Sequence, residues 1–121
     1  MVPVTALIVD DHPGFRRFAR KLVEEAGLVV VGDADDGASA LAAVRELHPD
    51  VVLLDVLLPD TTGLEVARTL AAGPARPVVI LTSSRSADDL GMHPGRDGAD
   101  VFISKSELTA AGIAAAARPG A

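Results

Sequence analysis

The sequence predicts an α/β fold in which helices cover both faces of an open, doubly wound parallel sheet. Five short runs rich in Val, Ile and Leu alternate along the chain with longer amphipathic stretches, as in a series of βα units. The short runs are apolar nearly throughout and lack in-and-out alternation, which is typical of strands buried on both faces. The 121 residues correspond to one compact domain.

The apolar runs give five expected strands, at residues 4–9, 28–31, 51–54, 78–81 and 101–103. Helices are expected from Pro13 to Gly27, over about residues 38–47, from Thr62 to Gly73, and from near Ser106 to Arg118. Pro13 suits a first helical turn because the N–H that it lacks would have no partner there. Thr62-Gly63-Leu64-Glu65 has the pattern of a capping box, in which two side chains satisfy the free amides of a helix start.

The interval before the fifth strand differs from the other helical intervals. Residues 89–98 include Gly91, Gly95, Gly98 and Pro94. Inside a helix, Gly costs about 1 kcal/mol and Pro about 3 kcal/mol relative to Ala. We therefore expect a short or irregular fourth helix.

Composition excludes several classes of protein. The chain has 11 Lys and Arg against 17 Asp and Glu, a net charge of −6, whereas a nucleic-acid-binding domain needs a basic face. The absence of Cys excludes disulfide scaffolds, thiolate zinc sites and cysteine nucleophiles. No apolar run approaches the ~20 residues that span a bilayer, and the first apolar stretch is typical of a strand rather than a signal peptide. We expect a cytoplasmic domain with no direct contact to nucleic acid or membrane.

Polar residues follow four of the expected strands. Asp10 and Asp11 come after the first strand, Asp55 after the third, Thr82 after the fourth and Lys105 after the fifth. In doubly wound sheets, ligands bind outside the carboxyl ends of the strands. The fold therefore predicts three carboxylates, a hydroxyl and an ammonium at one edge of the sheet.

This set of groups suits the chemistry of phosphoryl transfer. Clustered carboxylates repel one another unless a cation neutralises them, and oxygen ligands of this kind suit Mg²⁺. A carboxylate beside Mg²⁺ can attack phosphorus and form an aspartyl phosphate. Lys105 and Thr82 are chemically suited to hold the oxygens of the transferred group, on which charge develops. The sequence thus predicts a metal site, a nucleophile and an anion-binding pair.

The same residues carry a resemblance to a known family. The matching segments are Ile8-Val9-Asp10-Asp11, Val52-Leu53-Leu54-Asp55, Leu58-Pro59, Gly63, Thr82-Ser83 and Phe102-x-x-Lys105. In this order they make the chain similar, over essentially its full length, to the CheY-like receiver domains of two-component response regulators. The resemblance implies a flavodoxin-like (βα)5 sandwich with strand order 2-1-3-4-5. It places the receiver at residues 1–118, with 119–121 as a tail or the start of a linker.

The resemblance also implies a role for each site residue. Asp55 would accept the phosphoryl group, Asp10, Asp11, Asp55 and the backbone carbonyl of Leu57 would bind Mg²⁺, Lys105 would pair with the phosphate, and Thr82 and Phe102 would form the switch. The partner would be a sensor histidine kinase, and a homodimer could form through the face of the fourth helix, fifth strand and fifth helix. His12-Pro13 and Lys105-Ser106-Glu107-Leu108 resemble receivers that are joined to a C-terminal LuxR-type helix-turn-helix and regulate transcription. Such a chain catalyses only its own phosphorylation and dephosphorylation.

Three alternatives stay open. A Mg²⁺-dependent phosphohydrolase of the haloacid dehalogenase type also forms an aspartyl phosphate, but it needs a carboxylate two residues beyond the nucleophile, where this chain has Leu57. A flavodoxin-like nucleotide binder needs a hydroxyl- and glycine-rich loop after the first strand and aromatic rings to stack on a flavin. Asp11-His12-Pro13-Gly14 would repel phosphate, and the chain has neither Trp nor Tyr. The third alternative is a pseudo-receiver that binds its partner without phosphorylation.

A few residues near these motifs receive a structural interpretation. Asp60 is assigned to a loop or helix cap, and His12, His48 and His93 to the surface or to loops. Ser106 stands where the family often has a Pro after a cis peptide bond. Because a cis bond before a residue other than Pro costs about 3 kcal/mol, we expect a trans Lys105–Ser106 bond.

Overall fold

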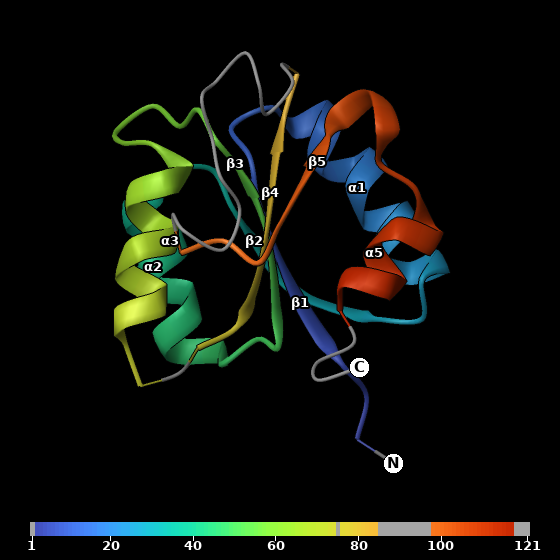
Figure 1. Cartoon of the computed structure of the whole chain (residues 1–121), viewed down its shortest axis with the longest axis horizontal. Coiled ribbons are helices and arrows are strands. Elements are labelled where there is room, and N and C mark those ends of the chain that lie inside the picture. The colour runs from blue at the N-terminus through green and yellow to red at the C-terminus, as the bar shows by residue number, and fades with distance from the viewer. Residues whose placement is uncertain (1, 75, 85–97, 118–121) are drawn as a thin grey trace.

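A computed structural model describes residues 2–74, 76–84 and 98–117. Its centre is a five-stranded parallel sheet with the strand order β2-β1-β3-β4-β5 (Figure 1). The strands are β1 (Thr5–Val9), β2 (Val29–Ala34), β3 (Val51–Asp55), β4 (Val78–Ser83) and β5 (Val101–Ser104). The α/β class and the strand order expected from the sequence are confirmed.

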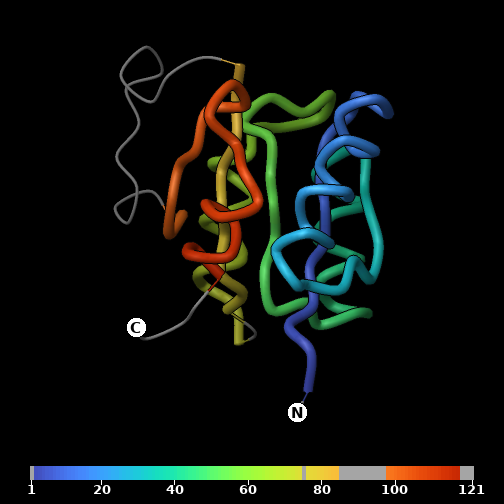
Figure 2. Tube along the Cα trace, turned by 90° about the vertical axis from the view of Figure 1, so that its right-hand side faces the viewer, coloured from blue at the N-terminus to red at the C-terminus, as the bar shows by residue number. Residues whose placement is uncertain are grey.

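Helices cover both faces of this sheet. They are α1 (Pro13–Glu25), α2 (Gly37–Leu47), α3 (Gly63–Ala72) and α5 (Ala110–Ala116), with a short 3₁₀ helix, η1 (Lys105–Glu107), after β5. Figure 1 shows α2 and α3 on one side of the sheet and α1 and α5 on the other. Figure 2, seen from the side of α1 and α5, has these two helices in front of the sheet.

The core consists of two apolar layers, one on each face of the sheet. Along β1, Leu7 and Val9 pack into the layer that contains buried residues of α2 and α3. Ala6 and Ile8 pack into the opposite layer, with buried residues of α1 and α5. Because successive strand residues point to opposite faces and both faces are covered, the central strands are apolar throughout.

Local signals in the sequence account for the helix starts. Pro13 occupies the first turn of α1, and the Asp36 side chain caps α2 by accepting a hydrogen bond from the Ser39 amide. The Thr62 hydroxyl accepts from the Glu65 amide at the start of α3. This is one half of the expected capping box, and the Glu65 carboxylate accepts instead from Arg68.

Two predicted boundaries are wrong. The second strand continues to Ala34, three residues beyond the expected end, because Gly32, Asp33 and Ala34 pair with β1 although they do not extend the apolar run. The last helix does not begin near Ser106. The chain forms η1 there, passes through the extended and buried Leu108, and starts α5 at Ala110.

The structure leaves two expectations open. The expected short or irregular fourth helix falls almost wholly on residues 85–97, outside the described residues. The boundary between a receiver of residues 1–118 and a tail of residues 119–121 also lies outside them. The peptide bond between Lys105 and Ser106 is trans as expected, since the described chain has no cis peptide bond.

Asp60 joins two segments that are distant in the sequence. Its carboxylate accepts hydrogen bonds from the backbone amides of Gly37 at 2.8 Å and Ala38 at 3.1 Å. These amides belong to the first turn of α2, where a helix has free N–H groups and attracts negative charge. The two bonds hold the pKa of Asp60 below its ordinary value. Asp60 is thus a cap, as expected, but for a helix that precedes it in the chain.

We expect Asp60→Ala to lower the free energy of unfolding at pH 7, because it leaves two amides of α2 without their acceptor. Since the folded-state pKa of Asp60 is lowered, its contribution is complete above the unfolded value of 3.8 and is lost as the pH falls through the folded value. Urea unfolding from pH 7 downward measures the difference between variant and wild type. A difference that does not shrink below pH 3.8, or that is equally large for Asp35→Ala at an exposed site, would contradict this assignment.

Candidate functional site

Three side chains from distant parts of the sequence meet at the carboxyl edge of the sheet. Asp10 follows β1 and Asp55 ends β3, and these two strands are neighbours. Lys105 follows β5, and its Nζ lies 2.8 Å from Asp10 Oδ2 and 3.4 Å from Asp55 Oδ2. The ammonium therefore bridges the two carboxylates. The structure brings together three of the residues that the sequence predicts for this edge.

The bridged carboxylates are almost completely buried. The side chain of Asp10 is 1% exposed and that of Asp55 is 6% exposed, whereas the Lys105 side chain is 19% exposed. Burial alone would raise the pKa of Asp10, but hydrogen bonds from Lys105 and His12 outweigh this effect and lower it below its ordinary value. Burial raises the pKa of Asp55. Lys105 opposes that shift and the charge of Asp10 adds to it, so that the pKa of Asp55 lies above its ordinary value.

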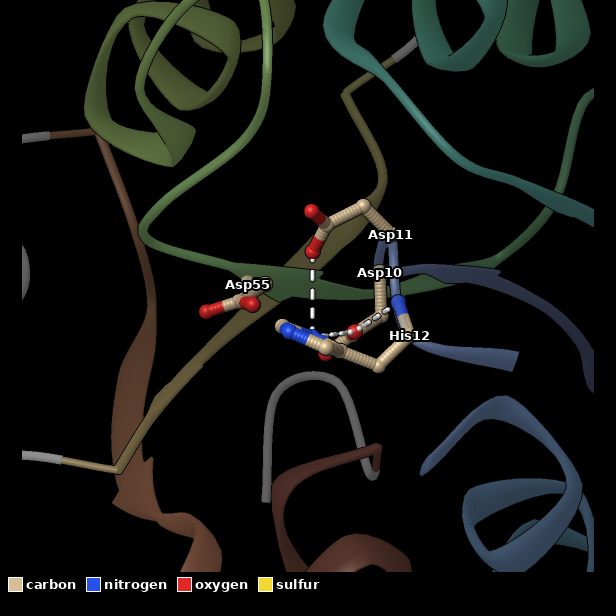
Figure 3. Close-up of side chains that lie close together, drawn as sticks. All are labelled: Asp10, Asp11, His12 and Asp55. Atoms are coloured by element: carbon tan, nitrogen blue, oxygen red, sulfur yellow. Dashed lines mark hydrogen bonds and ion pairs between the residues drawn. The ribbon is translucent and has the colours of Figure 1, made fainter. Parts of the chain in front are cut away.

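Asp11 and His12 complete the acidic edge (Figure 3). His12 Nδ1 lies 2.9 Å from Asp10 Oδ1 and 3.0 Å from Asp11 Oδ1, although 68% of the His12 side chain is exposed. The His12 backbone amide also donates to Asp10 Oδ1, at 2.8 Å. His12 lies on the surface, as expected, and its ring also contacts the two carboxylates of the acidic edge. Its position directly after Asp11 was the signal for this contact.

The other two histidines differ from His12. His48 is exposed at the end of α2 and has a left-handed backbone with φ of 48°, in agreement with its assignment to the surface. His93 falls outside the described residues.

The backbone around Asp55 is closely packed. The Leu57 amide lies 3.4 Å from Asp55 Oδ1, and 61% of Leu57 is exposed. Gly63 packs directly against the Asp55 carbonyl, at a place where a Cβ atom would collide with backbone. Its amide donates to the Val56 carbonyl at 2.6 Å. Only a residue without a side chain fits there, so Gly63 holds the start of α3 against the end of β3.

The two expected switch residues lie on the neighbouring strands. Thr82 on β4 is the register partner of Asp55 on β3. Its hydroxyl is buried and lies 3.5 Å from the Leu54 carbonyl. Phe102 on β5 is partly buried and packs against the apolar layer on the α2 and α3 side of the sheet. Both residues occupy ordinary structural positions in this conformation.

The donor set fits a hard divalent cation. Asp10, Asp11, His12 and Asp55 can each offer one ligand atom, and these atoms lie within 4.8 Å of one another. Carboxylate oxygens are the protein ligands that Mg²⁺ prefers, usually with water and phosphate oxygens completing the shell. A cation would also relieve the repulsion among these three carboxylates, two of which, Asp10 and Asp55, contact Lys105.

A family model described as "Response regulator receiver domain" matches residues 6–117. The chain belongs to this family. It is 32% identical over 104 residues to the DNA-binding transcriptional activator EvgA of Escherichia coli K12, covering 86% of this chain and 51% of EvgA. Members of this family serve as the receiver domains of two-component response regulators.

Solved structures give the same assignment. The signal receiver domain of NarL from Mycobacterium tuberculosis superposes with a TM-score of 0.81 and 31% identity, covering 96% of this chain and 94% of that one. A LuxR-family response regulator from Aurantimonas sp. SI85-9A1 gives a TM-score of 0.79 and 28% identity, covering 87% and 76%. The expected similarity to receivers of LuxR-type regulators is confirmed.

The curated relatives are longer than this chain. They include transcriptional regulators and protein-glutamate methylesterases, and the chain spans between 24% and 51% of their lengths. The part that matches is the receiver. In the described part of the chain, no helix combines the length and the apolar character that a membrane span requires.

We expect Asp55→Asn to raise the thermal midpoint by a few degrees at pH 7 in buffer without divalent cations. The raised pKa of Asp55 means that its charged form destabilises the folded state. Stability therefore falls as the pH rises from the unfolded-state value of 3.8 through the folded-state value, and the advantage of Asn develops over that range. Calorimetric melting of both proteins at several pH values measures it. An unchanged or lower midpoint at pH 7, or an equal gain from the exposed-site control Asp35→Asn, would speak against this electrostatic account.

Proposed function

We propose that Asp55 accepts a phosphoryl group in a Mg²⁺-dependent reaction and that the transfer switches the domain between two conformations. The observation that carries this proposal is the Lys105 ammonium, which lies between Asp10 and Asp55 at 2.8 and 3.4 Å. One cation cannot balance three carboxylates, so the edge is suited to a second cation and to a group that brings oxygen ligands with it. A phosphoryl group on Asp55 would bring such oxygen ligands to the second cation.

The reaction follows from the groups at the edge. A carboxylate oxygen of Asp55 attacks the phosphorus of a phosphohistidine, a P–O bond forms, and the P–N bond to the imidazole breaks. The imidazole nitrogen keeps the electron pair and takes up a proton. A Mg²⁺ ion held by Asp10, Asp11, Asp55 and the Leu57 carbonyl would neutralise charge on the phosphoryl oxygens during this transfer.

Lys105 and Thr82 act on the product. The Lys105 ammonium is within hydrogen-bonding distance of both buried carboxylates and can follow the negative charge onto the phosphoryl oxygens. The Thr82 hydroxyl, beside Asp55 in the sheet, can donate to the same group by leaving the Leu54 carbonyl. Its movement would open space toward which Phe102 on β5 could turn. Because only the phosphorylated protein offers these contacts, phosphorylation would favour the conformation in which Thr82 and Phe102 have moved.

The proposal also covers the partners of the domain, its location in the cell and the process that it regulates. The phosphodonor is a sensor histidine kinase, the domain works in the cytoplasm, and it controls an output domain or partner, with transcription as the regulated process. A homodimer would use the face that includes β5 and α5. The domain does not bind nucleic acid itself, and it catalyses only its own phosphorylation and dephosphorylation. Leu57 supports the last point, since its exposed apolar side chain cannot act as an acid or base toward water.

We expect incubation with Mg²⁺ and acetyl phosphate to add one phosphoryl group per chain, mapped to Asp55 by mass spectrometry. Asp55→Asn is the test variant, and Asp35→Asn, at an exposed site, is the matched control. Labelling in the control and none in Asp55→Asn agrees with the proposal. Continuous release of phosphate would indicate a phosphohydrolase, and an unlabelled wild-type protein that still binds its kinase would indicate a pseudo-receiver.

We expect Leu57→Asp to shorten the lifetime of the phosphorylated state by about tenfold, because a carboxylate two residues after Asp55 can orient an attacking water. Leu57→Ala is the control, since it also removes the apolar side chain but adds no acceptor. The decay of the phosphorylated protein after removal of the phosphodonor, followed by mass spectrometry, gives the lifetimes. Equal decay of the Asp and Ala variants would show that residue 57 does not orient water.

A further inference from the structure

Lys105 has a third contact besides the two carboxylates. Its Nζ lies 4.1 Å from the centroid of the Phe15 ring. Phe15 belongs to the first turns of α1, which begins directly after the loop that carries Asp10 and Asp11. The ammonium is thus enclosed by Asp10, Asp55 and the face of an aromatic ring.

The ring suits this position for an electrostatic reason. The face of a benzene ring is negative and attracts a cation that lies within about 6 Å of its centroid, and more strongly where water is excluded. The Lys105 side chain is flexible, and its ammonium group has three N–H donors that can rotate toward any nearby acceptor. The ring holds the cation without replacing the carboxylate or phosphoryl oxygens as acceptors for its N–H groups.

Phe15 is itself fixed by its surroundings. It is partly buried and packs against the apolar layer between the sheet and helices α1 and α5. Its ring meets Phe18, one turn further along α1, at 6.1 Å between centroids and 49° between planes. The next residue, Arg16, donates to the Asp10 carbonyl at 2.6 Å and so attaches this turn of α1 to the loop of the site. These contacts hold the ring beside Lys105 and the two carboxylates in this structure.

We propose that Phe15 is a positioning residue, whose ring holds the Lys105 ammonium between Asp10 and Asp55, ready for the phosphoryl group. This inference rests on the proposed function and deepens it. An apolar side chain of similar size would preserve the packing of α1 but would not attract the cation. Loss of the ring therefore affects the orientation of Lys105 and the rate of phosphoryl transfer more than it affects stability.

Phe18 provides a matched control on the same helix. It is also a phenylalanine, it contacts Phe15, and it is 50% exposed. Among the described residues, the ring that lies over the Lys105 ammonium is that of Phe15 and not that of Phe18. Phe15→Leu removes the ring beside the ammonium, Phe18→Leu removes a ring from the same cluster, and Phe15→Tyr keeps the aromatic face. Phe15→Met replaces Phe15→Leu if the latter does not fold.

The first measurement does not depend on phosphorylation. The face of an aromatic ring shifts the NMR signals of nearby protons upfield. The signals of the Lys105 ε-methylene protons are assigned by their absence in Lys105→Arg. We expect them upfield of the corresponding signals of the other lysine in the chain. This shift is expected to persist in Phe15→Tyr and Phe18→Leu and to vanish in Phe15→Leu. Ordinary Lys105 shifts in the wild type, or unchanged shifts in Phe15→Leu, would overturn the proposal.

The second measurement is the rate of labelling by acetyl phosphate at saturating Mg²⁺. The energy of a cation–aromatic contact corresponds to a rate lower by roughly three- to tenfold in Phe15→Leu, with recovery in Phe15→Tyr and little change in Phe18→Leu. An unchanged rate in Phe15→Leu, or equal losses in all three variants, would overturn the positioning role. If the wild type takes no phosphoryl group at all, the proposed function fails, and the NMR shifts alone decide whether the ring holds Lys105.

Discussion

The ion pairing of one lysine with two buried aspartates is the constraint on which the rest of the site depends. Asp10 and Asp55 lie on adjacent strands and would repel each other in a region from which water is largely excluded. Lys105 is 95 residues from Asp10 and 50 residues from Asp55 in the sequence. Lys105 therefore reaches both carboxylates only when the first, third and fifth strands have taken their places in the sheet. Assembly of the fold and assembly of the site are coupled in this way.

Much of the architecture could be predicted because local signals agree with tertiary structure. Apolar runs marked the strands, and Pro13 and Thr62 marked helix starts. The errors occur where tertiary contacts decide. The second strand is an edge strand, so pairing with β1 carries it through polar residues that interrupt the apolar pattern. Near the C-terminal end of the described chain, burial of Leu108 and the cap at Thr109 divide what resembles one helix into two.

The site shows the same division. The sequence could predict which residues share an edge, because parallel strands bring their carboxyl ends together. It could not predict contacts that depend on the conformation of a loop or on the packing of a helix. The ring of His12 reaches Asp10 and Asp11 because the extended backbone of His12 turns it back toward them. Phe15 looked like one more member of the apolar stripe of α1, and its relation to Lys105 arises only when α1 packs beside the end of β5.

The loop between β3 and α3 is attached at two points. Asp60 binds it to the start of α2, and Gly63 seats it against the carbonyl of Asp55. The loop thus connects the end of β3 with the first turns of α2 and α3. A displacement of the end of β3 would therefore be transmitted to the starts of both α2 and α3.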